Sequence, residues 1–219
     1  SELPPGHWCL FANYVAARDG QSLDDSVKMF FAMTNAVLDA SIVSWEAKRY
    51  YDYVRPVSAI HHLFKDKPVR AWAGPYQGTR WILGQDWQPY QAKTVVTPPF
   101  AEYMSGHSIF SRAAATVLRK FTGSDLFDMS VTIAKGSSRV EPGLVPAQDV
   151  TLSWPTFTSA ANEAGKSRRF GGIHFVDGDT EGRKAGKLIG KQAWRKALSY
   201  INPGHDDAMF DPLDAAPED

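Results

Sequence analysis

Three glycines recur at every fourth position near the C-terminal end of the chain, at Gly182, Gly186 and Gly190. Each glycine costs about 1 kcal/mol relative to alanine in a helix interior, so a stripe of them needs a packing reason. A stripe of glycines on one helix face lets a neighbouring backbone approach closely. We therefore predict a helix over residues 180–200 that crosses another helix at short distance within a bundle.

Two other segments place apolar side chains at helical spacing. The first covers residues 24–51, after a start at Ser22 and Asp25 that resembles a capping box. The second covers residues 106–121, with Gly123 positioned to end it as a C-cap. Both segments predict amphipathic helices that contribute to the same core.

The remaining segments predict less regular structure. Residues 131–133 and 150–152 are short β-branched runs, which predict one small hairpin. A short helix is expected over 155–164, because proline suits a first helical position, with Gly165 ending it. Prolines interrupt residues 57–100 and predict loops with short helical pieces there: Pro68, Pro75, Pro89, Pro98 and Pro99.

These patterns predict a mainly α fold, a helical bundle with one minor β hairpin. A length of 219 residues suits a single catalytic domain over 1–219, in which 203–219 forms an acidic tail. The chain starts at Ser1 without an initiator methionine. A missing N-terminal helical region, a homo-oligomer or a partner chain that completes the bundle therefore stays open as an expectation.

Composition excludes several classes of function. Lys and Arg number 24 against 24 Asp and Glu, so no diffuse field favours nucleic acid, and no apolar run approaches the roughly 18 residues of a membrane span. Cys9 is alone, which excludes a disulfide within the chain and a four-cysteine zinc site. We expect a protein with neither nucleic acid nor membrane as partner, and favour a soluble, secreted or periplasmic location.

Three short clusters carry the candidate chemistry. They are Lys48 with Arg55-Pro56, then Ser105-Gly106-His107, then Ser167-Arg168 with His174. Each cluster alone is equally typical of a solvated charge or a helix cap. Together they place cations, hydroxyls and histidines at predicted helix ends, where free backbone N–H groups favour an anion. They predict an oxyanion site where helix ends converge.

The order and spacing of these clusters resemble a known signature, Lys-x6-Arg-Pro, Ser-Gly-His and Ser-Arg-x5-His. It belongs to the superfamily of type 2 phosphatidic acid phosphatases and vanadium-dependent haloperoxidases. The stretches YYDYVRP, TPPFAEYMSGH and GGIHF are similar to its bacterial haloperoxidase branch. The resemblance covers about residues 45–190.

The resemblance implies an active site at converging helix ends that holds vanadate, with phosphate as a competing occupant. The implied binding residues are Lys48, Arg55, Ser105, Gly106, Arg168 and His174. His174 would bond to vanadium, and His107 would act as a general acid and base with a pKa near neutrality. Lys48 would also be catalytic, by polarising the bound oxidant.

One position departs from the superfamily pattern. Members usually have an aspartate four residues after the metal-bound histidine, where it orients the imidazole, but Gly178 stands there in this chain. Its neighbours Asp177 and Asp179 are the candidate orienting residues, since orientation of the far ring nitrogen is the physical requirement. They equally suit a helix cap and a solvent-exposed charge.

Three functions remain open at this stage. Trp45 and Phe100 match aromatic positions that line the halide side in chloroperoxidase-like members, which favours a haloperoxidase that uses hydrogen peroxide, a halide and a small organic acceptor. These two aromatics are equally typical of an ordinary core. The second candidate is an acid phosphatase that forms a phosphohistidine at His174, and the third is a non-catalytic module that binds an oxyanion.

Overall fold

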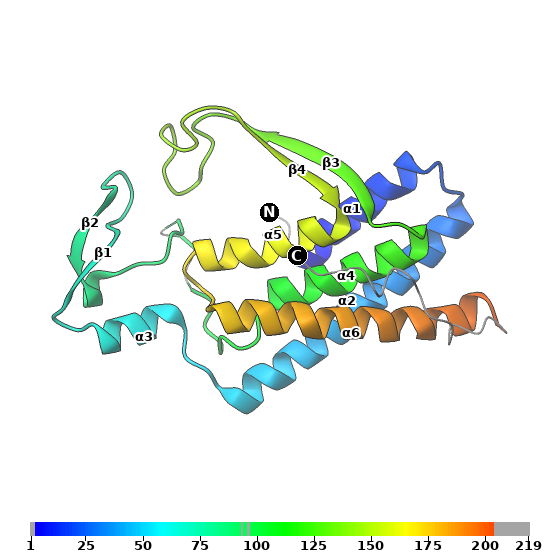
Figure 1. Ribbon diagram of the computed structural model, residues 1–219, viewed down its shortest axis with the longest axis horizontal. Helices are drawn as coiled ribbons and strands as arrows, with labels where there is room; N and C mark the ends of the chain where they lie inside the picture. Colours follow the sequence, from blue (N-terminus) through cyan, green and yellow to red (C-terminus); the bar gives the residue numbers. More distant parts are fainter. Residues whose placement is uncertain (1–2, 93, 96, 204–219) are drawn as a thin grey trace.

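The computed structural model describes residues 3–92, 94–95 and 97–203, and the expected tail beyond 203 lies outside that range. The protein is mainly α-helical, as predicted (Figure 1). The helices are α1 (Pro4–Arg18), α2 (Leu23–Tyr51), α3 (Pro56–Leu63), α4 (Gly106–Thr122), α5 (Phe157–Phe170) and α6 (Val176–Ile201), with a short 3-10 turn η1 (Gly84–Asp86).

Helix α4 occupies the centre of the bundle, between α1, α2, α5 and α6 (Figure 1). Its side chains are buried almost continuously from Ser108 to Arg119. The helix begins after the N-cap Ser105 and ends at Gly123, whose φ of 69° is the left-handed conformation expected of a C-cap glycine. The predicted boundaries of this helix are confirmed.

The glycine stripe packs α6 directly against the backbone of α4. A Cβ atom at Gly190 would lie 2.7 Å from the carbonyl oxygen of Ala113, and one at Gly186 would overlap that of Ile109. At Gly182 the nearest atom would be Cβ of Ser108, at 3.0 Å. The predicted close crossing is confirmed, and its partner is the helix that begins with Ser105-Gly106-His107.

Helix α2 begins at Leu23 after Ser22, whose side chain accepts from the backbone N–H of Asp25, as predicted. Its inner face packs on α4 and α6, while its outer face exposes an apolar row, namely Val27, Phe31, Leu38, Ile42 and Trp45. The helical stretch Leu23–Leu63 holds a window of mean hydropathy 1.2, one third buried, which passes a length and composition test for a membrane span. The sequence reading expected no such stretch. A bundle helix that faces the core on one side passes the same test.

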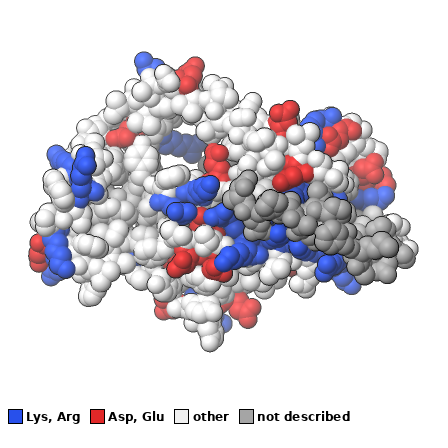
Figure 2. Space-filling view, viewed as in Figure 1, with Lys and Arg blue, Asp and Glu red and all other residues white. Residues whose placement is uncertain are grey.

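Two antiparallel hairpins extend from the bundle. Strands β3 (Leu126–Ile133) and β4 (Val150–Thr156) pair with Val131 opposite Leu152, which confirms the predicted hairpin and lengthens it. A second hairpin, β1 (Pro68–Trp72) with β2 (Thr79–Leu83), lies where loops were expected. Lys and Arg lie interspersed with Asp and Glu over the face shown in Figure 2.

One helix prediction was wrong, and one helix was not predicted. Pro155 lies in β4, at the register shift between Leu126 and Met129, where a residue without an N–H is tolerated. Helix α5 therefore starts at Phe157 and runs past Gly165, which is buried against the carboxylate of Asp179. Helix α1 was not predicted, although it contributes buried side chains such as Trp8 to the core.

Candidate active site

Lys48 lies in the last turn of α2 and is 4% exposed. Its Nζ donates to three backbone carbonyls, those of Ala101 (3.0 Å), Glu102 (2.9 Å) and Met104 (2.7 Å). Burial, followed by the charge of Arg55, lowers the pKa of Lys48 from 10.5 to about 8. The ammonium is thus fixed in place and can still be charged at neutral pH.

Arg55 stands between α2 and α3 and is 6% exposed. Its Nε donates to the carbonyl oxygen of Phe100 at 2.9 Å, and its Nη1 donates to that of Ile173 at 2.9 Å. The same Nη1 lies 3.1 Å from Nε2 of His174. Pro56 begins α3 and Arg55 is its extended N-cap residue, so the guanidinium lies outside both helices and turns back toward the bundle.

His174 follows the turn between α5 and α6 and is 7% exposed. Its Nδ1 lies 2.5 Å from Oε1 of Glu102, and the same oxygen accepts from the backbone N–H of Phe175 at 3.1 Å. A carboxylate that accepts from Nδ1–H leaves the lone pair on Nε2, on the side of Arg55. Burial is the largest effect on the imidazole and lowers its pKa.

The carboxylate on His174 is neither of the two that the sequence suggested. Asp179 is fully buried, and it accepts from Ser108 Oγ at 2.9 Å and from Arg183 Nε at 3.0 Å. Asp177 is exposed. The reason is that α6 begins at Val176, four residues earlier than expected, so these side chains project around a helix. Glu102 could have been suspected as the one carboxylate between residues 97 and 108.

The Ser105-Gly106-His107 cluster forms the start of α4. Ser105 is buried and its Oγ accepts from the backbone N–H of Ser108 at 3.4 Å, so it is a helix cap at the site. Burial lowers the pKa of His107 from 6.5 to about 3, and the charge of Arg168 adds to this effect. The pKa of His107 is therefore lower than the near-neutral value expected from the sequence.

Arg168 lies in the last turn of α5, beyond Gly165, where the sequence predicted that this helix would end. Its Nε is buried and has no hydrogen-bond partner among the residues that the structure describes. Burial and the charge of Arg55 lower the pKa of Arg168 to about 10. A buried charged donor without an acceptor is costly, so this atom indicates that an anion belongs beside it.

The three clusters converge electrostatically. The charges of Arg55 and Lys48 both lower the pKa of His174, and the charge of Arg55 acts on Arg168 as well. The donors gathered here form, together with His174, a group that we call the cage: the guanidinium groups of Arg55 and Arg168, the ammonium of Lys48, the N-terminus of α4 and the imidazole of His107. This donor set suits a tetrahedral oxyanion such as phosphate or vanadate, with Nε2 of His174 facing the same space.

Trp45 and Phe100 form an aromatic wall beside Lys48. Their ring centroids are 5.0 Å apart, and Nζ of Lys48 lies 5.4 Å from the ring of Phe100. The guanidinium carbon of Arg55 lies 5.2 Å from the same ring. Trp45 is 49% exposed and Phe100 is 42% exposed, so neither is an ordinary core residue.

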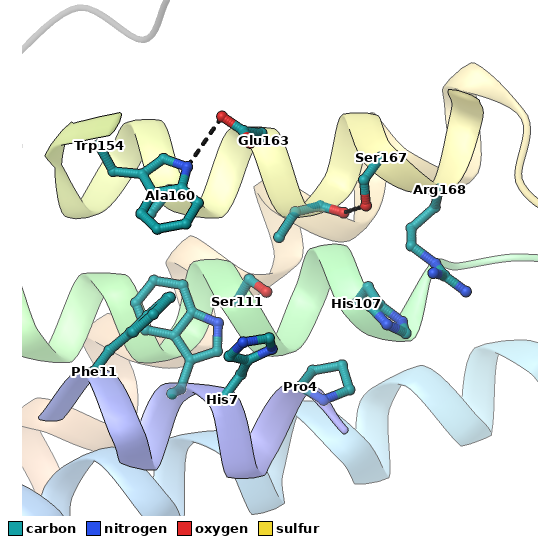
Figure 3. A pocket seen from close by; sticks show the side chains of 12 residues that line it. Pro4, His7, Phe11, His107, Ser111, Trp154, Ala160, Glu163, Ser167 and Arg168 are labelled. Carbon is teal, nitrogen blue, oxygen red and sulfur yellow. Dashed lines mark hydrogen bonds between the residues drawn. The ribbon is translucent and has the colours of Figure 1, made fainter. Parts of the chain in front are cut away.

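A cavity of about 330 Å³ adjoins the other side of the site (Figure 3). His107 and Arg168 lie at one end, and Trp154 and Phe11 lie toward the other. Helix α1, which sequence reasoning missed, supplies one wall of this cavity. The imidazole of His107 thus borders a cavity of a size that suits a small molecule.

A family model described as the VCPO second helical-bundle domain matches residues 28–203. No curated protein matches the chain. The fold is similar to that of a holo-type bacterial vanadium-dependent chloroperoxidase, with a TM-score of 0.82 and 27% identity over 90% of this chain. An apo-type bacterial vanadium-dependent chloroperoxidase gives a TM-score of 0.73 and 30% identity over 78% of the chain.

A vanadium-dependent iodoperoxidase, described as the first bacterial one, gives a TM-score of 0.64 with 27% identity over 88% of this chain. The chain spans about two fifths of the length of these solved proteins, since the matches cover 42%, 36% and 39% of them. Each of these three proteins is similar in part of its length to the present chain, which carries the cage described above.

Proposed function

Because the chain belongs to the vanadium-dependent haloperoxidase superfamily, we propose that it is a vanadate-dependent haloperoxidase, which oxidises a halide with hydrogen peroxide to hypohalous acid. The observation that carries the proposal is the buried Nε of Arg168, without a partner among the described residues and in a cage with the cations Lys48 and Arg55. An oxyanion is the group that relieves both the unpaired donor and the mutual repulsion of these cations.

Vanadate fits this cage through the residues already described. Lys48, Arg55 and Arg168 would neutralise its oxygens, the hydroxyl of Ser105 and the backbone N–H of Gly106 would donate to them, and Nε2 of His174 would be the ligand to the metal. When bound here, vanadate supplies a Lewis-acidic centre at which hydrogen peroxide becomes reactive toward halide.

His107 is the residue that would move protons. Its low pKa means that the imidazole is neutral and able to accept a proton from hydrogen peroxide as the latter binds. The negative charge of a bound oxyanion opposes the effect of Arg168 and raises this pKa toward the working range. Hydrogen peroxide and a small organic acceptor would approach through the cavity that His107 borders.

The aromatic wall favours halide oxidation over ester hydrolysis. Trp45 and Phe100 present exposed apolar surface beside Lys48, which suits a polarisable halide. A hypohalous acid formed there would halogenate an electron-rich organic acceptor, with water as the second product.

The second candidate is a phosphatase, because phosphate fits the same cage. Nε2 of His174 would attack phosphorus, His107 would protonate the departing alkoxide, and water would then hydrolyse the phosphohistidine. The third candidate, an oxyanion-binding module, uses the cage without turnover and predicts binding with no activity in either assay.

Substitution of the proposed metal ligand tests the assignment. We expect His174→Ala to abolish vanadate-dependent oxidation of thymol blue, with His62→Ala, at an exposed histidine of α3, as the matched control. Oxidation at the wild-type rate by His174→Ala would contradict the proposed ligand. Hydrolysis of p-nitrophenyl phosphate with no halide oxidation, and a phosphohistidine trapped in acid, would establish the phosphatase instead.

A further inference from the structure

Glu102 contacts two residues of the cage, His174 and Lys48. Its carboxylate Oε1 accepts from Nδ1 of His174 at 2.5 Å and from the backbone N–H of Phe175 at 3.1 Å. Its backbone carbonyl accepts from Nζ of Lys48 at 2.9 Å, and its N–H donates to the carbonyl of Tyr53 at 2.8 Å. With 1% exposure, this carboxylate is shielded from water, so its orientation is determined by these partners.

Gly178 provides the space in which that carboxylate lies. A Cβ atom at position 178 would overlap Oε1 of Glu102 and would lie 2.8 Å from its Cδ. The carbonyl of Gly178 also accepts from the backbone N–H of Ser105 at 2.8 Å, which fixes the first turn of α6 against the start of α4. A side chain at position 178 and the carboxylate of Glu102 would therefore occupy the same volume, so only one of them fits there.

We propose that Glu102 is the positioning residue of His174, and that Gly178 is required because it leaves room for the carboxylate to reach Nδ1. A carboxylate accepting from Nδ1–H fixes the tautomer and directs the Nε2 lone pair into the cage. Glu102 contacts Nδ1 of His174, whereas Arg55 contacts Nε2, so Glu102 acts through the imidazole. This role deepens the proposed function. It rests on that function only for the statement that Nε2 of His174 binds vanadium.

Removal and relocation of the carboxylate test this role. We expect Glu102→Ala to weaken binding of inorganic phosphate and of orthovanadate about 30-fold, measured by calorimetry. Gly178→Asp alone should also weaken binding, because two side chains then compete for one volume. The double variant Glu102→Ala with Gly178→Asp supplies a carboxylate from α6 into the vacated space, and should recover at least tenfold of the lost affinity.

Asp177→Asn is the matched control, since it removes an exposed carboxylate next to Gly178 in the first turn of α6. Its phosphate affinity should equal that of the wild type. Nitrogen-15 spectra of the imidazole give a second readout that needs no catalysis. The Nδ1–H signal of His174 should persist in Asp177→Asn and should be lost in Glu102→Ala.

If Glu102→Ala lowers the melting temperature, the isosteric Glu102→Gln carries the same test, with a smaller loss of affinity and a shifted Nδ1–H signal. Unchanged phosphate affinity and an unchanged Nδ1–H signal in the Glu102 variants would overturn the positioning role. If the wild type binds phosphate and responds to these substitutions but oxidises no halide, the proposed function fails while the positioning role stands.

Discussion

The stripe of glycines on α6 contacts two different kinds of neighbour. Gly182, Gly186 and Gly190 face the backbone and small side chains of α4, whereas Gly178, one turn earlier on the same stripe, faces the carboxylate of Glu102. The first three glycines bring two helices together. The fourth makes room for the group that hydrogen-bonds His174. The same residue at the same spacing thus serves packing in one region and chemistry in the other.

The packing region should respond through stability alone. We expect Gly186→Val to lower the free energy of unfolding by about 3 kcal/mol, because its side chain would overlap the carbonyl of Ile109. Urea denaturation measures this change, with the exposed Leu188→Ala on the same helix as control. A loss below 0.5 kcal/mol, the scale of an ordinary surface substitution, would contradict the close crossing.

The cage should respond through binding alone. We expect Arg168→Gln to weaken phosphate binding by about 2 kcal/mol, roughly thirty-fold in Kd, since a charge-assisted donor is lost. The free energy of unfolding should not fall, because the removed guanidinium has a buried Nε without a partner among the described residues. Arg169→Gln, an exposed neighbour in the same turn, serves as the control in calorimetry. Equal losses in both variants would mean that the effect is one of net charge only.

Gly178→Ala tests the boundary between the two regions. We expect a loss of about 1 kcal/mol in stability, together with a roughly fivefold weaker affinity for phosphate, because the added methyl group displaces the carboxylate of Glu102. Denaturation and calorimetry on the same sample give both numbers. A change in stability with no change in affinity would place Gly178 with the packing glycines.

Anion binding should also depend on pH through Lys48. Its pKa of about 8 means that the ammonium is charged below pH 8 and becomes neutral above it, so affinity is highest below pH 8 and falls as pH rises. Sulfate is the suitable probe, because its own charge is constant over this range. We expect about fourfold weaker binding at pH 8.5 than at pH 7, and no such decrease in Lys48→Met. A decrease of the same size in both would assign the effect to another group.

The smallest expected effect concerns the aromatic wall. Trp45→Ala should raise the KM for bromide about threefold, which is the scale of a partly exposed aromatic contact with a charge, and should leave phosphate affinity unchanged. Steady-state kinetics at saturating peroxide measure it, with Phe31→Ala on the outer face of α2 as control. An equal KM for wild type and Trp45→Ala would remove the wall from the halide site.

Sequence reasoning predicted the parts of this molecule that depend on local pattern. The glycine stripe, the Ser105 cap and the residues of the three clusters each follow from short spacings along the chain. Pro155 was misjudged because proline fits a helix start and an irregular strand equally well, and only the pairing of β3 with β4 decides between them.

The orienting carboxylate could not be predicted by the same means. Glu102 and His174 are 72 residues apart, and they meet where the start of α6 packs against the start of α4. Motif spacing directed attention to Asp177 and Asp179, whose actual positions depend on where α6 begins. A long-range contact of this kind follows from packing, which no local pattern encodes.

The central claim is that this cage holds vanadate and uses it to oxidise halide. Monochlorodimedone bromination by the purified chain, with hydrogen peroxide and bromide, tests it most directly when measured before and after addition of orthovanadate. We expect activity to appear with vanadate and to decrease as phosphate is added. Bromination that is independent of vanadate, or absent while vanadate binds at the cage, would contradict the claim.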